Sequence, residues 1–416
     1  MVGMVNATTR ATGAQQKATR RRESGAWIAV ILGTLTVFGP LSMDLYLPVL
    51  PSLAIDLDGT ASSAQLTMTA CLIGLAAGQV IAGPMSDRFG RRTPLLVGLV
   101  VYTIASALCA MSLTIAVLVA ARFVQGLAGG TGLVIAQTVG RDIYEGTRLT
   151  RYYARIIVIS GLAAIVAPVL GGFLAEHLSW RGFFVILTAI GVLVTAAIAA
   201  SFPDTLPPDR RTSGGLHRVR EQLGVLVRDR LYVGATVSSS LTSAAYFAYL
   251  AGAPFILQGI YGLAPSTFAL VFGLNAAAFA AAGFSAGRLA ERAGERTVFA
   301  VGLAIMIAGG ATLLVTALWM PSLALTITAF VLIAAGAAVV SPPSTTLALV
   351  DYPHFAGTAS SILGMTRFAA GAAAAPLAGI LGPHTAAPTA ITVLAASLGG
   401  TVVYRALVHR RTARSS

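Results

Sequence analysis

The chain has 416 residues, of which 56% are hydrophobic and 10% charged, and its mean hydropathy is +0.81. This composition excludes an ordinary water-soluble fold, in which about 25% of the residues are charged. The net charge of +13 could suggest a nucleic-acid partner. However, the Lys and Arg residues gather in the two tails and in alternate loops. We therefore expect no nucleic-acid binding, and a membrane topology with both termini in the cytoplasm.

Long apolar runs dominate the chain. A membrane-spanning helix needs about 20 predominantly apolar residues, and twelve runs satisfy this requirement. The sequence therefore predicts an all-α polytopic membrane protein embedded in the lipid bilayer. The runs lie at residues 27–50, 64–84, 94–112, 114–138, 156–177, 182–202, 231–256, 266–287, 297–318, 321–342, 357–381 and 386–407.

The tail before the first run is polar and basic, and that run is too long for the core of a signal peptide. We therefore expect no cleavage and a multi-pass protein of the bacterial inner membrane. Cys71 and Cys109 both lie inside apolar runs, so the sequence indicates neither a disulfide nor a metal site. No cofactor is expected.

The first run contains Asp44, the only carboxylate that lies well inside any of the twelve runs. Burying it costs about 3 kcal/mol on insertion scales, so an intramembrane acid is a functional candidate by default. The alternative is that this helix ends early, at Tyr46-Leu47-Pro48, and leaves Asp44 in a hydrated loop.

A polar decapeptide, Gly83–Arg92, separates the second and third runs and predicts a tight hairpin between helices. The same pattern returns at Gly287–Arg296: Gly, three residues, acid–Arg, one residue, Gly, one residue, Arg. One copy could simply follow the positive-inside rule. Two copies indicate a protein built from two related halves, as many transporters are. We expect these loops to gate transport through Gly83, Asp87, Arg88, Gly90, Arg91, Arg92, Glu291 and Arg292.

The fourth run contains Arg122 and Gln125. Counted at about 1.5 Å per residue from the outer ends of their runs, Asp44 and Arg122 both lie roughly 10 Å below the outer surface. Each charge would be disfavoured there alone, so we expect a direct or water-bridged pair that couples protons to transport. The alternative is that Arg122 only extends its side chain to the surface.

The fifth run contains Pro168, Gly171 and Gly172. Small residues and a proline predict a helix that packs closely and bends, which suits an interface between moving halves. A helix that merely packs with a kink would have the same sequence features.

The second half offers fewer signals. Aromatic and polar residues of its first two runs could line an apolar cavity, and Arg367 lies about 16 Å from the cytoplasmic end of its helix. We expect the substrate cavity to include Tyr46, Gln125, Tyr246, Tyr249, Asn275 and Arg367.

The Gly83–Arg92 loop resembles the signature loop between helices 2 and 3 of the major facilitator superfamily, whose usual form is G-x-L-x-D-R-x-G-R-R. Met85 stands where Leu is usual, and Glu291 replaces Asp in the second copy. Arg122-Phe-Val-Gln-Gly126 resembles the R-x-x-Q-G motif that the superfamily associates with proton coupling.

Residues 163–172 resemble the G-x-x-x-G-P-x-x-G-G motif of drug:proton antiporters, with Ala163 and Ala167 in place of two glycines. Together with Met43–Pro51 and Arg141–Tyr144, these motifs resemble the bicyclomycin and chloramphenicol resistance exporters. The resemblance implies twelve transmembrane helices in two pseudo-symmetric six-helix bundles around a central cavity. It also implies alternating access, with drug expulsion driven by inward proton flow.

We accordingly expect a monomer with small-molecule drugs and protons as its partners. The expected organisation is a cytoplasmic tail at 1–25, an N-terminal six-helix bundle at 26–202, a cytoplasmic linker at 203–230, a C-terminal six-helix bundle at 231–407 and a cytoplasmic tail at 408–416. The alternative function is proton-coupled export of a physiological metabolite such as a sugar or an amino acid. An enzyme is not expected, because no nucleophile–base pair or set of metal ligands appears.

Overall fold

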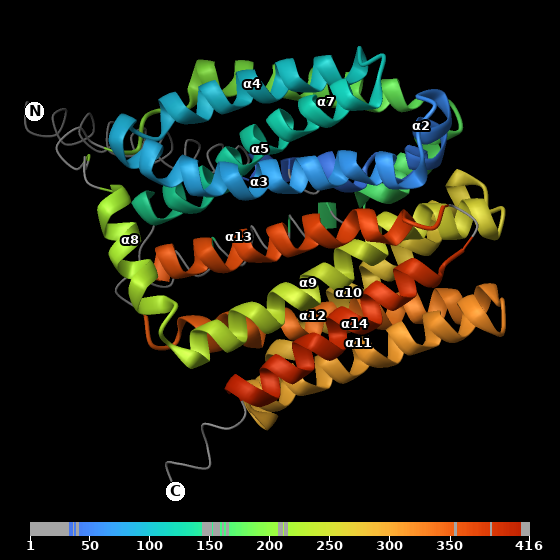
Figure 1. The fold of residues 1–416 in the computed structure, drawn as a ribbon. Coiled ribbons are helices and arrows are strands. Elements are labelled where there is room, and N and C mark those ends of the chain that lie inside the picture. The colour runs from blue at the N-terminus through green and yellow to red at the C-terminus, as the bar shows by residue number, and fades with distance from the viewer. Residues whose placement is uncertain are drawn as a thin grey trace, which may run out of the picture.

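The computed structural model describes residues 33–35, 37–38, 41–143, 152, 159, 162–163, 166–206, 211, 215–352, 356–382 and 385–408. Over these residues the chain is helical and contains no strand (Figure 1). The predicted all-α class is thus confirmed for the described part of the chain. The helices are η1 (Leu47–Val49), α2 (Leu50–Asp56), α3 (Ala61–Phe89), α4 (Arg92–Ala110), α5 (Ile115–Ile143), α7 (Trp180–Ser201), α8 (Gly215–Leu226), α9 (Arg230–Pro254), η3 (Phe255–Ile260), α10 (Pro265–Ala293), α11 (Glu295–Leu318), α12 (Leu323–Leu349), α13 (Ala356–Ala374), η5 (Ala375–Gly379), α14 (Ala387–Val403) and η6 (Tyr404–Val408).

Within the described residues, nine helices are long and apolar enough to cross a membrane. Each of them corresponds to one of the predicted apolar runs. The predicted run at 357–381 is α13 followed by the short η5. The runs at 27–50 and 156–177 fall partly outside the described residues, as do both predicted tails.

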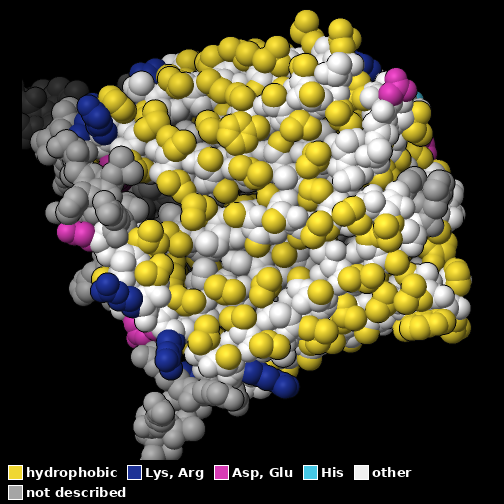
Figure 2. All heavy atoms as spheres, in the orientation of Figure 1, with side chains coloured by type: hydrophobic (Ala, Val, Ile, Leu, Met, Phe, Trp, Pro, Cys, Tyr) yellow, Lys and Arg dark blue, Asp and Glu magenta, His cyan; other side chains and the backbone are white. Residues whose placement is uncertain are grey.

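Two layers of helices face each other in Figure 1, and we call residues 41–206 the first half and residues 230–408 the second half. The layers meet where α3 of the first half packs against α13 of the second half. Figure 2 shows a body covered by hydrophobic side chains, with most of the visible Lys and Arg toward one edge. We call this edge, where α3 and α10 end, the arginine-rich end, and the other edge the opposite end.

Helices α3 and α5 pack backbone against backbone through facing glycines. A Cβ on Gly74 or Gly78 would overlap the carbonyl oxygen of Phe123 or Leu127, and a Cβ on Gly126 would overlap that of Cys71. Such small-residue contacts hold helices together in lipid through close packing. Apolar side chains gain no hydrophobic free energy there, because the lipid tails that surround them are equally apolar. The first half is therefore built around a tightly fixed helix pair.

The repeated decapeptide is mostly helix and not a hairpin loop. Helix α3 continues to Phe89 and α10 to Ala293, and each ends at a glycine with positive φ: +84° at Gly90 and +80° at Gly294. The acid–Arg pair of each copy lies in the last turn of its helix. The glycine that follows adopts the positive φ that ends the helix. The predicted tight hairpin is thus a two-residue turn, Gly90-Arg91, in the first copy and a single glycine, Gly294, in the second.

The first membrane helix ends earlier than the run at 27–50 predicted. Asp44 is its last helical residue; a turn, η1 and α2 follow. The cause is Pro48 and Pro51, which have no N–H to continue the helical hydrogen bonds. Asp44 nevertheless remains half-buried and is not a freely exposed loop residue.

The predicted linker contains a helix, α8, which the sequence analysis did not anticipate. Helix α8 lies at the arginine-rich end against α3 and α13 (Figure 1). Thr358 Oγ1 of α13 donates a hydrogen bond to Gln222 Oε1 of α8 at 2.6 Å. The linker is thus docked on both halves.

At the opposite end the halves are joined directly. Gln258 Nε2 donates to the carbonyl oxygen of Pro48 (2.9 Å), and Gln65 Nε2 donates to that of Ala251 (3.1 Å). Ser62 Oγ donates similarly to the Pro376 carbonyl (3.2 Å). These contacts close the opposite end between the two halves.

Candidate functional site

Arg91 follows the turn at Gly90 and joins two helices. Its Nη1 donates to Asp87 Oδ1 (2.6 Å) and Ser86 Oγ (2.7 Å) in α3, and its Nε donates to Asp142 Oδ2 (2.9 Å) in α5. Burial disfavours the charged guanidinium, but the bonds to Asp142 and Asp87 outweigh burial and raise the pKa of Arg91 above its usual value. Arg91 therefore stays charged and holds the ends of α3 and α5 together.

The start of the linker is bound to the same turn. Asp204 Oδ1 accepts from the backbone N–H of Arg91 (2.9 Å) and of Leu206 (3.2 Å), and Asp204 Oδ2 accepts from Arg211 Nη2 (2.9 Å). A Cβ on Gly90 would overlap the Asp204 carboxylate. The turn thus needs glycine for its backbone conformation and also for the space that the linker occupies.

Sequence reasoning assigned no role to Asp142 or Asp204. Asp142 is in the Arg141–Tyr144 motif, and Asp204 is the first acid after the sixth apolar run. The signal that could have found them is charge balance, because a basic turn that is buried needs carboxylates from elsewhere.

The second copy of the repeat lacks this network. Glu295 occupies the place of Arg91, directly after the turn glycine. The three salt bridges among the described residues join Arg91 to Asp87, Arg91 to Asp142 and Arg211 to Asp204. Glu291 and Arg292 lie at the end of α10 and take part in none of them. The two predicted gating loops therefore share a backbone turn but not an ion-pair network.

Arg122 is fully buried in the first half and has no acidic partner among the residues that the structure describes. Its Nη1 donates to Gln125 Oε1 (2.5 Å), its Nη2 contacts Met43 Sδ (3.7 Å), and its guanidinium lies 4.4 Å from the centre of the Tyr46 ring. Gln125 in turn donates to Ser106 Oγ (2.7 Å). Tyr46 and Gln125 are themselves fully buried, so both enclose Arg122.

A direct Asp44–Arg122 ion pair, one of the two expected arrangements, is not present among the described residues. The reason is orientation. The residue that contacts Arg122 is Met43, and neighbouring positions of a helix point about 100° apart. The depth argument correctly compares the levels of Asp44 and Arg122 in the membrane, but it does not determine whether their side chains point toward each other.

Asp44 lies within electrostatic range of the second half. Its carboxylate lies close enough to the hydroxyl groups of Tyr246 and Tyr249 to interact electrostatically with both. Tyr249 is 1% exposed, as is Asn275, whose amide nitrogen and oxygen have no hydrogen-bond partner among the described residues. An acid of one half and two tyrosines of the other thus lie within electrostatic range of each other.

Aromatic rings surround these polar groups. Tyr249 stacks on Phe272 (6.0 Å between ring centres, 12° between planes) and contacts Phe330 (4.9 Å). Tyr246 contacts Phe279 (5.5 Å) and Phe247 (5.8 Å). These rings form an aromatic cluster that is buried at Tyr249, Phe272 and Phe330 and only partly buried at Tyr246, Phe247 and Phe279.

The short helix Val166–Ala175 contains the predicted antiporter residues Pro168, Gly171 and Gly172. A Cβ on Gly171 would overlap the carbonyl oxygen of Leu45, next to Asp44. A Cβ on Gly172 would overlap the methyl group of Ala269 in α10, in the second half. The helix therefore lies in close contact with both halves.

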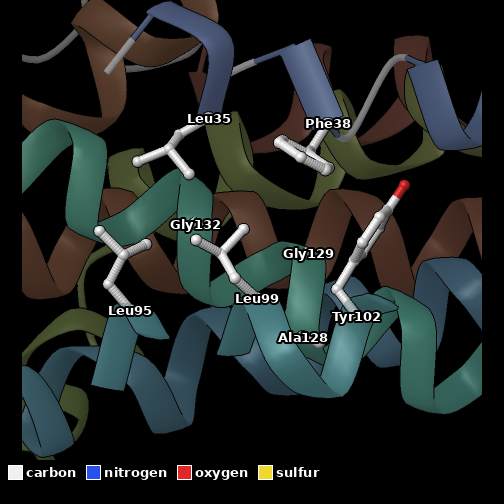
Figure 3. A pocket seen from close by; sticks show the side chains of 8 residues that line it. All are labelled: Leu35, Phe38, Leu95, Leu99, Tyr102, Ala128, Gly129 and Gly132. Carbon is white, nitrogen blue, oxygen red and sulfur yellow. The ribbon is translucent and has the colours of Figure 1, made fainter. Parts of the chain in front are cut away.

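Two cavities lie away from these residues. Figure 3 shows Leu35, Phe38, Leu99 and Tyr102 pointing toward one another in an apolar crevice of about 10 Å³, next to α5. That volume is about what one water molecule requires. A larger cavity of about 260 Å³ lies at the opposite end and is lined by residues of both halves that include Asp56 and Gln258.

Comparison with known proteins agrees with this architecture. The model of the Major Facilitator Superfamily matches residues 32–376. The chain is 35% identical to the "Uncharacterized MFS-type transporter YdgK" of Bacillus subtilis over 94% of this chain and 97% of that protein. It is 29% identical to the "Bicyclomycin resistance protein homolog" of Haemophilus influenzae (91% and 95% covered) and 29% identical to a "Chloramphenicol resistance protein" of Pseudomonas aeruginosa (82% and 81%).

Solved transporters share the fold. A bacterial homolog of the human lysosomal transporter Spinster, in an inward-facing conformation, aligns with a TM-score of 0.72 at 15% identity and covers 93% of this chain and 96% of its own. A D-xylose–proton symporter aligns with a TM-score of 0.73 at 15% identity (91% and 97%). These similarities confirm the resemblance to the resistance exporters and point away from catalysis. The chain is a multi-pass membrane transporter that belongs to the Major Facilitator Superfamily.

Proposed function

We propose that the protein exports small amphipathic drugs in exchange for protons. The observation that carries this proposal is Asp44, a half-buried carboxylate of the first half that lies within electrostatic range of Tyr246 and Tyr249 of the second half. A titratable group between two moving halves can link its protonation to their relative position. The relatives named for bicyclomycin and chloramphenicol resistance support drugs as the cargo.

The proposed topology has twelve membrane helices in two six-helix bundles, with bundle boundaries at 26–202 and 231–407. The nine spans and the three remaining apolar runs support this number. The arginine-rich end and both termini lie in the cytoplasm, and the membrane is the bacterial inner membrane. The closed opposite end then faces outward, so the structure corresponds to a state closed to the outside.

In the proposed cycle, Asp44 takes up a proton when the cavity faces outward and releases it when the cavity faces inward and receives a drug. Arg122 acts as a positioning residue, because it contacts Met43 and Tyr46 on either side of Asp44 in the sequence. Asp87 serves the gate at the cytoplasmic side through Arg91. The cargo contacts the partly buried rings of Tyr246, Phe247 and Phe279.

A polar metabolite is the second candidate cargo. Arg367 supports it, because this arginine and the hydroxyl groups that bind it provide more polarity than a purely apolar drug needs. A growth-inhibition panel across drug classes, with and without expression of the protein, separates the two candidates. Resistance to drugs favours the first, and unchanged inhibition in every class removes it.

The coupling is tested by substrate-induced proton release from the purified protein and by export in vesicles. The parent should release protons on drug addition, and a protonophore should abolish its export at constant ATP. Asp44→Asn should insert normally, release no protons and lose proton-driven export. If Asp44→Asn releases protons as the parent does, Asp44 is not the coupling site.

A further inference from the structure

Arg367 of α13 is held by three hydroxyl groups from two other helices. Its Nε donates to Ser239 Oγ of α9 (3.3 Å), and its Nη2 donates to Ser344 Oγ (2.7 Å) and Thr345 Oγ1 (3.2 Å) of α12. It is the twelfth residue of a 19-residue helix, roughly 16 Å from the first turn. A guanidinium is thus fixed at mid-membrane depth within the second half.

The three hydroxyls orient the guanidinium but do not balance its charge. Ser344 Oγ and Thr345 Oγ1 donate their hydrogens to the Ser341 carbonyl, and Ser239 Oγ donates to the Thr236 carbonyl. Each oxygen therefore has lone pairs to offer Arg367. The partners are neutral, and no carboxylate of the described residues forms an ion pair with Arg367.

Arg367 differs from the two arginines that are buried in the described part of the chain. Arg91 has two carboxylates, and Arg122 is fully enclosed against aromatic rings. Arg367 is only half-buried, and its Nη1 has no partner among the described residues. A guanidinium has five donor hydrogens, and the bonds to the three hydroxyls use Nε and Nη2. The two hydrogens of Nη1 remain available.

An apolar surface continues from this arginine toward Asp44. Gly371, one turn after Arg367 on the same side of α13, lies against Phe247. Phe247 contacts Phe368 (6.0 Å between ring centres) and Tyr246 (5.8 Å). Tyr246 lies within electrostatic range of Asp44. A cation therefore lies at one end of an aromatic strip and a titratable acid at the other. That arrangement suits a molecule with an apolar body and a negative group at one end.

We propose that Arg367, fixed by Ser239, Ser344 and Thr345, is an anion subsite that binds a carboxylate or similar oxyanion of an amphipathic cargo through its free Nη1 edge. A charge-assisted hydrogen bond from a guanidinium already held in place needs little further ordering. This inference rests on the proposed function only in treating the bound molecule as cargo.

The test uses two probes of equal shape, 2-naphthoate and 2-naphthamide, titrated calorimetrically into the purified full-length protein in detergent without any proton gradient. The parent should bind 2-naphthoate at least tenfold more tightly than 2-naphthamide. Arg367→Gln retains hydrogen bonding to the hydroxyls but removes the charge, and it should lose at least tenfold of the 2-naphthoate affinity. Its 2-naphthamide affinity should stay within twofold. Arg288→Gln, at the arginine-rich end, is the control and should match the parent.

If Arg367→Gln does not fold, Ser344→Ala/Thr345→Val keeps the charge but frees the guanidinium. This variant should weaken 2-naphthoate binding about three- to tenfold and leave 2-naphthamide unchanged. A parent that binds both probes equally or binds neither at millimolar concentration overturns the proposal. If the variants lose equal affinity for 2-naphthoate and 2-naphthamide, the proposal is also overturned, because equal losses indicate that these residues serve packing.

A lipid phosphate offers the same chemistry, so the titration is repeated with phosphatidylglycerol. If the lipid displaces 2-naphthoate from the parent at stoichiometric amounts, the site belongs to lipid and not to cargo. Absence of displacement supports the cargo assignment. Because these measurements need no gradient, their result is independent of whether export proves to be proton-coupled.

Discussion

Gly171 and Gly172 are neighbours in the chain, yet each meets a different half of the molecule. Gly171 lies against the backbone of Leu45 in the first half, and Gly172 lies against Ala269 and Pro265 of α10 in the second half. The Gly171 contact lies within the first half and belongs to a fixed bundle. In the proposed cycle the Gly172 contact, which joins the two halves, forms only when the opposite end is closed.

Gly172→Ala should therefore shift the protein toward states in which the opposite end is open. The added methyl group overlaps Ala269, and overpacking of this kind costs about 1–3 kcal/mol, where 1.4 kcal/mol changes an equilibrium tenfold. Spin labels at Ile55→Cys and Thr267→Cys, both exposed, report the separation of the halves. The labelled distance should lengthen in the variant.

Gly171→Ala is the matched control, since its added methyl group meets backbone of the same half. It should lower the apparent Tm of the protein without lengthening the labelled distance. A Gly172→Ala variant that behaves like Gly171→Ala would show that both glycines serve packing only.

The two acids bound to Arg91 should differ in what they contribute. The Asp142 side chain is 18% exposed and that of Asp87 is 51% exposed. Asp142→Asn should reduce stability by about 1–3 kcal/mol, because it weakens a partly buried charged hydrogen bond. Asp87→Asn should cost no more than about 1 kcal/mol, as exposed pairs do, yet should lower vesicle transport severalfold if Asp87 serves the gate. Thermal unfolding and initial export rates measure the two effects separately; unchanged transport in Asp87→Asn removes the gating role.

The turn glycines predict a second asymmetry. Gly90 (φ +84°, ψ 171°) and Gly294 (φ +80°, ψ 149°) both adopt a conformation that is largely restricted to glycine. Gly294→Ala should cost about 1–3 kcal/mol from backbone strain alone. Gly90→Ala should cost more, because its Cβ also overlaps the Asp204 carboxylate. Adding Asp204→Ala to Gly90→Ala should recover part of the stability that Gly90→Ala loses. If the stability losses of the two single variants simply add in the double variant, the overlap between the new Cβ and the linker is ruled out.

Tyr246 should influence proton release without being required for folding. Tyr246→Phe removes the hydroxyl that interacts with Asp44 but keeps the ring that contacts Phe279. The pH at which drug-induced proton release is half-maximal should move measurably. Tyr232→Phe is the control: its hydroxyl bonds to the Ala359 carbonyl near the arginine-rich end, and proton release should stay as in the parent. Identical pH profiles in all three proteins would contradict a role for Tyr246.

The sequence predicted the features that depend on local composition. Apolar length identified the nine spans, and the repeated pattern identified two turns that have nearly equal φ values at Gly90 and Gly294. Helix length and the need for a turn glycine are properties of short segments, so one sequence is enough to find them.

Partners distant in sequence were not predictable in the same way. Asp142 and Asp204 lie 51 and 113 positions from Arg91, and nothing local points to them. The prediction of a direct Asp44–Arg122 ion pair was wrong for a related reason. The rise per residue gives the depth of a residue in the membrane, but the direction of its side chain also depends on where the helix ends and which neighbours the side chain meets. Pro48 and Pro51 set that end for the first helix.

The unbalanced charge of Arg367 has an electrical consequence. An anionic cargo that leaves the cell while one proton enters moves two elementary charges in the same electrical direction. A membrane potential of 100 mV then contributes about 4.6 kcal/mol per cycle, twice the ~2.3 kcal/mol for each charge. A neutral cargo gains half of that, and a monovalent cation gains nothing, because its charge cancels that of the proton. One side chain of α13 would thus decide how strongly the voltage across the membrane helps to expel the cargo.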